Sequence, residues 1–521
     1  MKNKLILILI FFIAVCFRWW LIADNQIYFW YDQARDAHVA QQIFLERDIK
    51  IQGPSASGTN DTIYHGVIYY YFIGFLYTIF NGNPFLVALT SGLINSLAIF
   101  LIYFLIEKVF NNKKMALIGA FLLAINFEHA QYSTWLSNPM MSLLPILIFF
   151  FLVWKLFYQF KTNQPVYLFV FLGCSLGLIE QSAFYSIYFF SVILIGLFYL
   201  INHKKLSIKK IFSLKQISIF IFSYILTISS MLLTQFKLFK AGIFNWQSLT
   251  NAIDGKTELV NLKIIEELLI SYLTKIIETI APNMTLYGFI LFIFILVVFF
   301  KKSKKSFVYF LLSWIFAPLW LFVIQFRNSP HMLIGVEYAL LIFLAFLINY
   351  LILQKKYLYQ LIVFIILLIY ALSQLKAVHI VREQSTSIFT FQTGVMLNNE
   401  LKVLDRTYQL TNNQPFSISV WGSPYEYYIT WAYLYNWYGK NKYGYLPSYF
   451  GSNQSGKYGE ELLKQKNQIG QVHFLIEEPE IVLIGDIYKQ FIYKQNEFSK
   501  LKSSEKIGEY KLEIRETINK I

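Results

Sequence analysis

Residues 5–36 read LILILIFFIAVCFRWWLIADNQIYFWYDQARD, an apolar run followed by a group of charged side chains. The run is long enough to cross a bilayer, which takes about 20 apolar residues. It has no small-residue cleavage site and carries Arg18 near its end, so we interpret it as an uncleaved anchor. The charged group at 31–36 is costly to place beside a membrane, and such groups usually mark functional sites.

The rest of the 521-residue chain repeats the apolar pattern. Hydrophobic residues make up 56% of it and charged residues only 14%. Apolar runs recur with basic clusters between them, which is typical of a polytopic α-helical membrane protein. The formal net charge of +15 comes mostly from lysines between these runs, so membrane surfaces explain it better than nucleic acid. We therefore expect membrane lipids, and no nucleic acid, as partners.

The lysines also predict an orientation. Basic loops usually face the cytoplasm, and placing them there gives about eleven crossings with a cytoplasmic N-terminus. The tyrosine-rich segment 64–80 must then lie along the surface as an interfacial helix, within a first outer loop at 24–83. The predicted spans are 5–23, 84–106, 115–131, 139–158, 166–181, 183–202, 216–236, 284–300, 307–325, 331–353 and 357–375.

The tail differs in composition from the rest of the chain. Polar and aromatic residues mix over 376–521, with strand-like stretches at 416–420 and 472–476 and helix-like stretches at 398–408 and 425–438. The sequence therefore predicts two domains: a transmembrane domain at 1–375 and a small extracytoplasmic α/β domain at 376–521.

Several polar groups are predicted on the outer side. In a helix that begins near Asp32, the side chains of Asp32, Arg35 and Asp36 share one face. An alternative is that Asp32 only caps this helix and its neighbours are solvated. Arginine binds phosphate oxygens with two parallel hydrogen bonds, so these groups suit a phosphate-bearing lipid. The other outer candidates are His65, Glu128, His129, Asn138, Arg327 and His331.

Other chemistries have weaker signals. The histidines show no compact ligand spacing, no glycine-rich phosphate loop precedes a helix, and no Gly-x-Ser-x-Gly motif occurs. We expect His38, His203, His379 and His473 to be ordinary surface residues.

The ordered motifs resemble those of GT-C class membrane glycosyltransferases, in the family 39-like branch of protein mannosyltransferases and the aminoarabinose transferase of lipid A. Asp32-Gln33-Ala34-Arg35 matches the first and fourth positions of that family's Asp-Glu-x-Arg motif. The stretch 65–70, HGVIYY, resembles its Lys-Pro-Pro-Leu-Tyr-Tyr segment, and 136–139, LSNP, stands where Leu-Asp-Pro often occurs. Gln33 and Asn138 replace two acids of the pattern. The resemblance covers roughly the first 350 residues.

The resemblance implies an inverting glycosyltransferase that moves a sugar from a polyprenyl-phosphate donor to a hydroxyl of a glycan, lipid or protein acceptor. It places this transfer at the outer face of the plasma membrane, with Asp32 as the catalytic base. Substrate binding is expected from Arg35, Asp36, His65, Glu128, His129, Asn138, Arg327 and His331. The resemblance assigns no metal ligand and no definite cofactor, and it leaves open a divalent cation. The alternative is a lipid-linked glycan flippase, which would need charges along its spans, and these are nearly charge-free.

Overall fold

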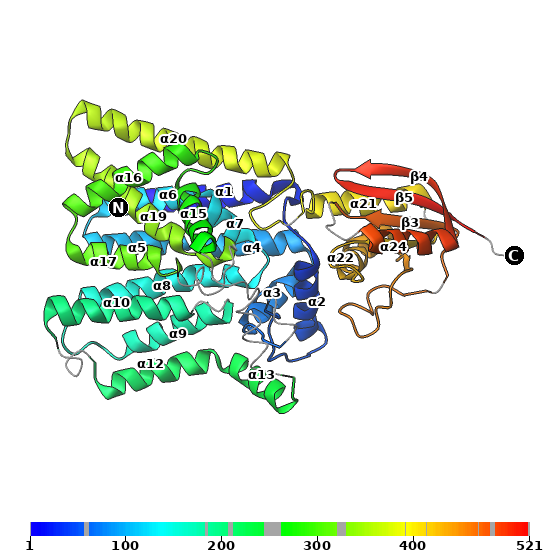
Figure 1. Cartoon of the computed structure of the whole chain (residues 1–521), viewed down its shortest axis with the longest axis horizontal. Helices are drawn as coiled ribbons and strands as arrows, with labels where there is room; N and C mark the ends of the chain where they lie inside the picture. The colour runs from blue at the N-terminus through cyan, green and yellow to red at the C-terminus, as the bar shows by residue number, and fades with distance from the viewer. Residues whose placement is uncertain are drawn as a thin grey trace.

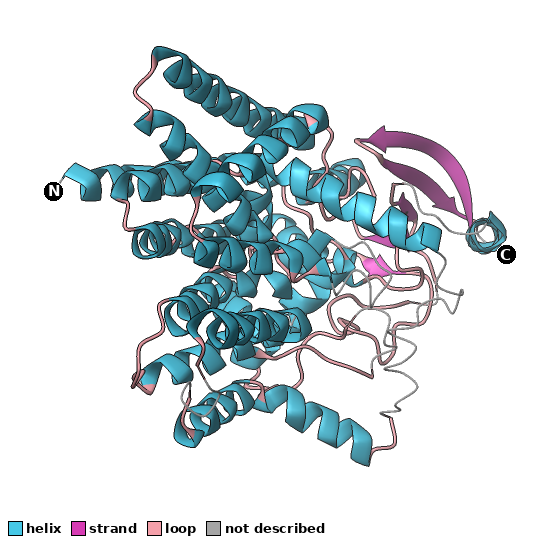
Figure 2. Cartoon of the chain, turned by 60° about the vertical axis from the view of Figure 1, so that its left-hand side comes forward, coloured by secondary structure: helices cyan, strands magenta, loops and turns pink. Residues whose placement is uncertain are grey.

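The computed structural model shows a bundle of helices with a mixed sheet at one end (Figure 1). Helices fill the bundle, and the strands gather on one side of it (Figure 2). The structure describes residues 2–56, 62–182, 186–206, 212–243, 262–319, 330–390, 392–412, 414–466, 468–479 and 485–518.

Apolar helices correspond to each predicted span, as far as the spans are described. They are α1 Lys2–Ile22, α4 Pro84–Asn95, α5 Ala98–Phe110, α6 Lys113–Ala124, α8 Leu143–Val153, α9 Tyr167–Ser182, α10 Ser186–Lys204, α12 Leu214–Thr227, α13 Ser229–Lys240, α16 Thr285–Lys302, α17 Lys305–Phe316, α19 Val336–Leu353 and α20 Tyr357–Glu383. By length and composition, six stretches of the described residues can cross a membrane. The pair α12 and α13, bent by 63°, makes up to seven. The count of about eleven stays a prediction, whereas a polytopic helical fold is confirmed.

Helix α19 lies at the centre of the bundle and packs against α6, α16, α17 and α20, together with α15 (Leu262–Ile280). It is apolar on all faces, as expected for a helix surrounded by protein. Small residues let it approach α6 closely: Ala116, Ala120 and Ala345 are fully buried. This packing gives the bundle a rigid core on which the outer elements rest.

Two helices of the first predicted outer loop lie at the sheet-facing end of the bundle (Figure 1). They are α2 (Tyr31–Leu45) and α3 (Ile68–Ile79), which pack against each other. The 12 residues of α3 extend about 18 Å, short of the roughly 30 Å hydrocarbon core. Helices α6 and α17 are equally short, so the non-crossing placement of 64–80 stays a prediction.

In the described part of the tail, five strands form one sheet in the order β2-β1-β3-β5-β4. Strand β1 (Phe416–Trp421) pairs in parallel with β2 (Ser448–Tyr449) and β3 (Val472–Glu477). Strand β5 (Tyr510–Thr517) is antiparallel to β3 and to β4 (Ser499–Ile507). The helices are α21 Leu397–Thr411, α22 Ile429–Leu434, α23 Lys440–Tyr443 and α24 Gly485–Phe498. The two predicted strands are both present, and α21 covers the predicted helix at 398–408.

Helix α20 continues to Glu383, beyond the predicted span 357–375, and the domain boundary at 375 stays a prediction. One expectation about the tail needs correction. His473, expected at the surface, is fully buried on β3. Its Nδ1 lies 2.8 Å from Ser417 Oγ and its Nε2 lies 3.1 Å from Ser419 Oγ. Burial lowers the pKa of this imidazole to about 4, so the ring is neutral near pH 7.

The tail sheet is attached to the bundle through α2. Gln41 Nε2 donates to Tyr433 Oη at 2.7 Å, and Tyr433 Oη donates to the Gly82 carbonyl at 2.7 Å. His38 Nε2 lies 2.8 Å from Glu461 Oε1, so His38 is a buried contact residue and not the surface residue expected. Helix α2 is therefore held between the bundle and the tail domain.

The two ends of the bundle are distinct. The N-terminus lies at the end opposite the sheet, and α20 runs from that end toward the sheet (Figure 1). The basic residues before α20 thus share an end with the N-terminal lysines, as the orientation rule requires.

Candidate active site

The candidate site begins in the first turn of α2. Trp30 precedes the helix in an extended conformation and occupies the N-cap position. The Gln33 Oε1 atom accepts a hydrogen bond from the Trp30 backbone N–H at 3.2 Å, which satisfies one free donor of the helix end. The alternative that Asp32 caps this helix is therefore wrong, because Asp32 already lies inside it.

Arg35 joins two carboxylates of unequal exposure. Its Nη1 lies 2.8 Å from Asp32 Oδ1, and its Nε and Nη2 donate to Asp36 Oδ1 at 2.9 and 2.7 Å. The Asp36 side chain is 3% exposed, whereas that of Asp32 is 46% exposed. The guanidinium is therefore fixed from inside by Asp36, and Asp32 remains accessible from outside.

Tyr70 on α3 completes the inner side of this cluster. Its hydroxyl donates to Asp36 Oδ1 at 3.0 Å. Burial raises the pKa of the Asp36 carboxyl to about 6, although the Arg35 guanidinium acts in the opposite direction. Burial also holds the pKa of the Tyr70 phenol well above its ordinary value, so it stays a donor. Asp36 is thus ionised near pH 7 and anchors Arg35.

The His65-Gly66 motif is fixed to the end of α9. The Gly66 N–H donates to the Gln181 carbonyl at 2.9 Å, and the Ile68 N–H donates to Gln181 Oε1 at 3.2 Å. A Cβ atom at position 66 would overlap the Gln181 side chain, so glycine permits this approach. The backbone N–H of His65 donates to the Pro54 carbonyl at 2.8 Å.

The LSNP motif at 136–139 is connected to both the Asp32–Arg35 motif and the His65-Gly66 motif. Gln33 Nε2 donates to the Leu136 carbonyl at 3.3 Å, and Asn138 Nδ2 donates to the Ser182 carbonyl. Ser182 follows Gln181 on α9, so hydrogen bonds tie all three motifs together. Both amides act here as donors to carbonyl oxygens, which an ionised carboxylate cannot do. This role explains why amides stand where the family pattern has acids.

Glu128 and His129, on α7 (Phe127–Thr134), contact other elements than α2. Glu128 accepts hydrogen bonds from Tyr132 Oη at 3.3 Å and from Thr279 Oγ1. It lines a cavity of about 370 Å³ with Lys275 and Glu278. His129 Nδ1 lies 3.2 Å from Glu337 Oε1, and both side chains are fully buried. The described contacts therefore do not bring this pair to the Asp32 cluster.

Two further predicted residues cannot be placed. Arg327 lies outside the described residues, and so does the side chain of His331. Within the described residues, no group of three or more His, Cys, Asp or Glu side chains lies close enough to hold a metal ion. The expectation of a divalent cation stays untested.

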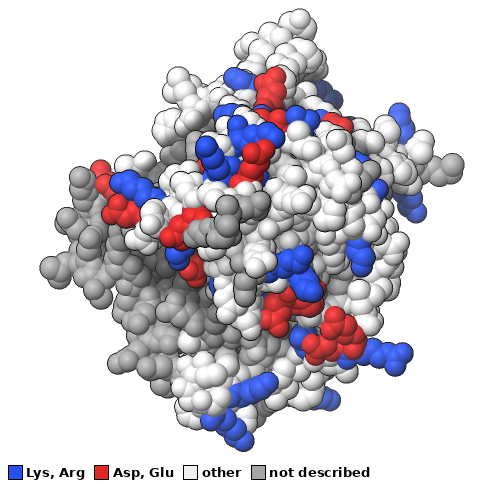
Figure 3. All heavy atoms as spheres, turned by 90° about the vertical axis from the view of Figure 1, so that its right-hand side faces the viewer, with Lys and Arg blue, Asp and Glu red and all other residues white. Residues whose placement is uncertain are grey.

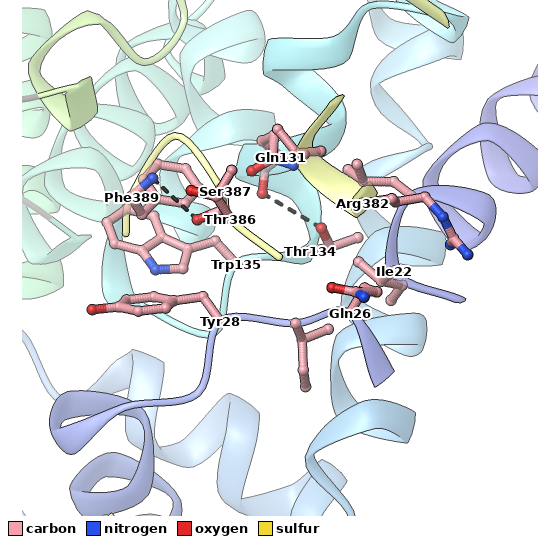
Figure 4. Close-up of a pocket in the computed structure, with 13 residues that line it drawn as sticks. Ile22, Gln26, Tyr28, Gln131, Thr134, Trp135, Arg382, Thr386, Ser387 and Phe389 are labelled. Atoms are coloured by element: carbon pink, nitrogen blue, oxygen red, sulfur yellow. Dashed lines mark hydrogen bonds between the residues drawn. The ribbon is translucent and has the colours of Figure 1, made fainter. Parts of the chain in front are cut away.

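A small pocket of about 20 Å³ separates α7 from the segment that follows α20. Trp135 and Phe389 stack there with ring centroids 3.8 Å apart, and Tyr28 lies beside them (Figure 4). None of the predicted site residues lines this pocket.

Sequence reasoning missed Tyr70 as part of the site. Tyr70 stands in the tyrosine-rich segment that we interpreted only as an interfacial helix, although it also belongs to the HGVIYY stretch. For Gln181, which ends a predicted span beside Glu180, the sequence left two interpretations open: a polar group of the site, or a buried residue with satisfied hydrogen bonds. In the structure Gln181 accepts backbone hydrogen bonds from the His65-Gly66 motif.

Comparisons with known proteins agree with the motifs. A family model described as dolichyl-phosphate-mannose-protein mannosyltransferase matches residues 64–232. No curated protein matches the chain. The crystal structure of ArnT from Cupriavidus metallidurans bound to undecaprenyl phosphate is similar, with a TM-score of 0.56, 10% identity, and 97% of each chain covered. The apo oligosaccharyltransferase of Archaeoglobus fulgidus has a TM-score of 0.52 and 13% identity, over 91% of this chain and 69% of that one.

At these identities the structures show a shared fold. Together with the family model, they confirm the resemblance to GT-C membrane glycosyltransferases.

Proposed function

We propose that this protein transfers a sugar from a polyprenyl-phosphate donor to an acceptor hydroxyl, with inversion at the anomeric carbon, on the outer face of the plasma membrane. The observation that carries the proposal is the Asp32–Arg35–Asp36 cluster, in which a half-exposed carboxylate adjoins a fixed guanidinium. The fold shared with ArnT, whose structure holds undecaprenyl phosphate, supports the lipid-phosphate donor.

The chemistry follows from the accessible Asp32 carboxylate and the mostly buried Arg35 guanidinium beside it. The acceptor oxygen attacks the anomeric carbon while the bond to the phosphate oxygen breaks, and Asp32 takes the hydroxyl proton. The polyprenyl phosphate leaves with a growing negative charge. Arg35 uses three contacts on its two carboxylates, which leaves two of its five N–H donors for phosphate oxygens. A fixed guanidinium of this kind stabilises charge as it develops.

A cavity beside the motifs suits the lipid chain. It has a volume of about 160 Å³ and lies between α3, α4, α8 and α9. Its wall is mostly apolar, with Asn95, Gln181 and Ser182 as polar residues. Gln181 and Ser182 are the residues that hold the Gly66 and Asn138 motifs, so an isoprenoid in this cavity would bring its phosphate toward α2.

The test is transfer by the purified protein from labelled polyprenyl-phosphate sugars. We expect Asp32→Asn to lower turnover by a factor of about 10² to 10⁴, the usual loss when a positioned base is removed. Its fold should persist, because the Asp32 side chain is peripheral. Asp486→Asn, an exposed change on α24, is the matched control. Near-normal turnover by Asp32→Asn would show that Asp32 is not the base.

The flippase alternative makes a different forecast. A flippase moves the lipid-linked glycan across a vesicle membrane but forms no new glycosidic bond. Appearance of a glycosylated acceptor, with its anomeric configuration read by NMR, therefore separates the two functions. Unchanged glycolipid that has crossed the vesicle membrane, without product, would favour the flippase.

A further inference from the structure

Aromatic and cationic side chains connect the Arg35 guanidinium, through Tyr31 of α2, to the tail domain. The Arg35 guanidinium lies 5.6 Å from the Tyr31 ring centroid, and the Tyr31 ring meets the Tyr427 ring edge-on at 5.2 Å. Lys457 Nζ lies 4.7 Å from the Tyr427 ring centroid. These four residues form a continuous series from the candidate catalytic helix onto the tail domain.

Tyr458 directly follows Lys457 in the chain, and its side chain is exposed. Burial raises the pKa of the Tyr31 phenol, and the nearby phenols of Tyr427 and Tyr458 contribute to the same effect. We call Tyr31, Tyr427, Lys457 and Tyr458 the aromatic platform.

The platform exposes aromatic surface beside charged groups. Tyr427 is 40% exposed and Tyr458 is 46% exposed, whereas the adjacent Tyr428 is buried. Exposed tyrosines can supply rigid contact area at low entropic cost, with an apolar ring and a polar hydroxyl.

The loops that carry the platform are fixed in place. Glu426 has a φ of 72°, a left-handed conformation that is strained for a residue with a side chain. Its carbonyl accepts hydrogen bonds from Ser452 Oγ at 3.1 Å, Gln454 Nε2 at 2.8 Å and Lys457 Nζ at 3.0 Å. The surroundings thus impose this conformation on the residue just before Tyr427, which is typical of a ligand-binding loop.

A second contact fixes the platform against the catalytic helix. Glu461 follows the Lys457-Tyr458 pair and lies 2.8 Å from His38 on α2. Both loops of the tail domain therefore have defined positions relative to Asp32, one through Tyr31 and one through His38.

We propose that the aromatic platform is an acceptor subsite that binds a pyranose ring, so that the acceptor is a glycan. This inference rests on the proposed transferase function. The C–H face of a pyranose is apolar and stacks on a tyrosine ring, while its hydroxyls accept from the Lys457 ammonium and the tyrosine hydroxyls.

The position of the platform favours the acceptor over the donor sugar. The tail domain lies beyond α2 as seen from the bundle, on the side away from the apolar helices (Figure 1). The described surface on that side mixes acidic and basic side chains without a field of one sign (Figure 3). A neutral glycan suits such a surface better than a strongly charged polymer.

The test is direct binding of simple glycosides to the full-length protein in detergent. The probes are methyl glucopyranoside, methyl galactopyranoside and methyl mannopyranoside, followed by saturation-transfer NMR. We expect transfer to ring C–H protons, with affinity lowered about tenfold in Tyr427→Ala and in Tyr458→Ala. Tyr427→Phe, which keeps the ring, should bind nearly as well as the parent. Tyr493→Ala, which removes another exposed tyrosine (67% exposed) on α24, is the control.

Asp32→Asn separates this inference from the proposed function, because it should still bind the glycosides while losing transfer. The melting temperature of each variant shows whether its fold is intact, and Tyr458→Ala keeps the test valid should Tyr427→Ala unfold. Once a donor and an acceptor that support transfer are known, Tyr427→Ala should raise the KM for the acceptor and leave the KM for the donor unchanged.

The subsite would be overturned by no glycoside binding by the parent, by alanine variants that both bind as well as the parent, or by a raised KM for the donor alone. Full-rate transfer to a peptide or a sugar-free lipid by Tyr427→Ala would also overturn it. Loss of glycoside binding in the alanine variants, together with normal transfer by Asp32→Asn, would support the subsite and contradict the role of Asp32 as the catalytic base.

Discussion

Arg35 is placed between an inner carboxylate that positions it and an outer one that stays accessible. Asp36 receives two hydrogen bonds from the guanidinium and a third from Tyr70. Hydrogen bonds between charged groups are stronger than neutral ones, so this inner contact should dominate the orientation of Arg35. The outer Asp32 can then exchange its contact with Arg35 for a proton from the substrate.

The buried carboxyl predicts a pH dependence. The pKa of Asp36 is raised from 3.8 to about 6, so its charge is lost as pH falls through about 6, and Arg35 then loses its inner partner. We expect kcat/KM to fall at low pH with an apparent pKa near 6. The Asp36→Asn variant should have a lower turnover, and its pH profile should lack this acid limb. An acid limb unchanged in Asp36→Asn would assign it to another group.

Acid unfolding through Asp36 does not explain the fall of kcat/KM at low pH. A carboxyl whose folded pKa lies above its unfolded value binds a proton more tightly in the folded state. Its contribution to stability therefore falls as pH rises from about 4 to about 6, and is constant above that. Acid protonates Asp36 without destabilising the fold through this group, so a melting curve at each pH separates the two effects.

Arg35→Lys tests the guanidinium itself. A lysine ammonium is a single point and cannot contact Asp32, Asp36 and a phosphate in the same arrangement. We expect kcat/KM to fall about 10- to 1,000-fold, the range for a lost charge-stabilising donor. Arg406→Lys is a matched control, since Arg406 also contacts a carboxylate through two nitrogens, on Glu505. Equal activity of the two variants would remove Arg35 from the mechanism.

Local sequence predicted residues whose partners are near in the chain. Asp32 and Arg35 meet because helical spacing places residues three apart on one face. His129 and His473 could not be assigned in this way, because Glu337 and Ser417 reach them only through the tertiary fold. The amides of Gln33 and Asn138 were recognised as departures, but their role as donors needed the positions of two carbonyl groups.

At the scale of elements, α2 and α3 approach closely at one glycine. A Cβ atom at Gly74 would overlap the carbonyl oxygen of Ala40 on α2. Gly74→Ala should therefore push the helices apart, at a cost of about 1–3 kcal/mol for overpacking, and move Tyr70 away from Asp36. We expect a lower melting temperature and reduced turnover.

Gly485→Ala is the matched control for this change, because a Cβ atom there meets nothing within 4 Å. A melting temperature for Gly74→Ala equal to that of the parent would show that α2 and α3 adapt to the added methyl group.

The apolar runs predicted which helices exist better than they predicted where each helix begins and ends. Each span was visible because burial in lipid or in protein requires a long apolar stretch. The 63° bend between α12 and α13 was not visible in the sequence, because no proline or glycine marks the break at Ile228. The tail helix predicted at 425–438 begins as α22 only at Ile429, because the preceding residues form the fixed loop around Glu426.

At the scale of the whole molecule, the orientation can be tested by labelling. We replace Cys16 and Cys174 and introduce single cysteines at two exposed positions, Ser455 in the tail domain and Lys304 between α16 and α17. An impermeant thiol reagent on intact cells should label position 455 and not 304, since basic loops remain inside. Labelling at 304 alone would invert the orientation and place the proposed site in the cytoplasm.

The sequence predicted a separate tail domain but not where it docks. Composition showed the change near residue 376, and strand patterns gave two strands of the sheet. The contacts that place the domain join Gln41 to Tyr433 and His38 to Glu461, and no local pattern encodes such distant pairs.

These contacts also impose an order in time. Asp32 leaves the ribosome before the last long helix, whereas the segment from Tyr427 to Glu461 is made after it. Until that segment has been made, the nascent chain carries its carboxylate and guanidinium without the surface that covers α2. A product that stalls or is cut before Tyr427 should therefore present an incomplete site to the lipids around it.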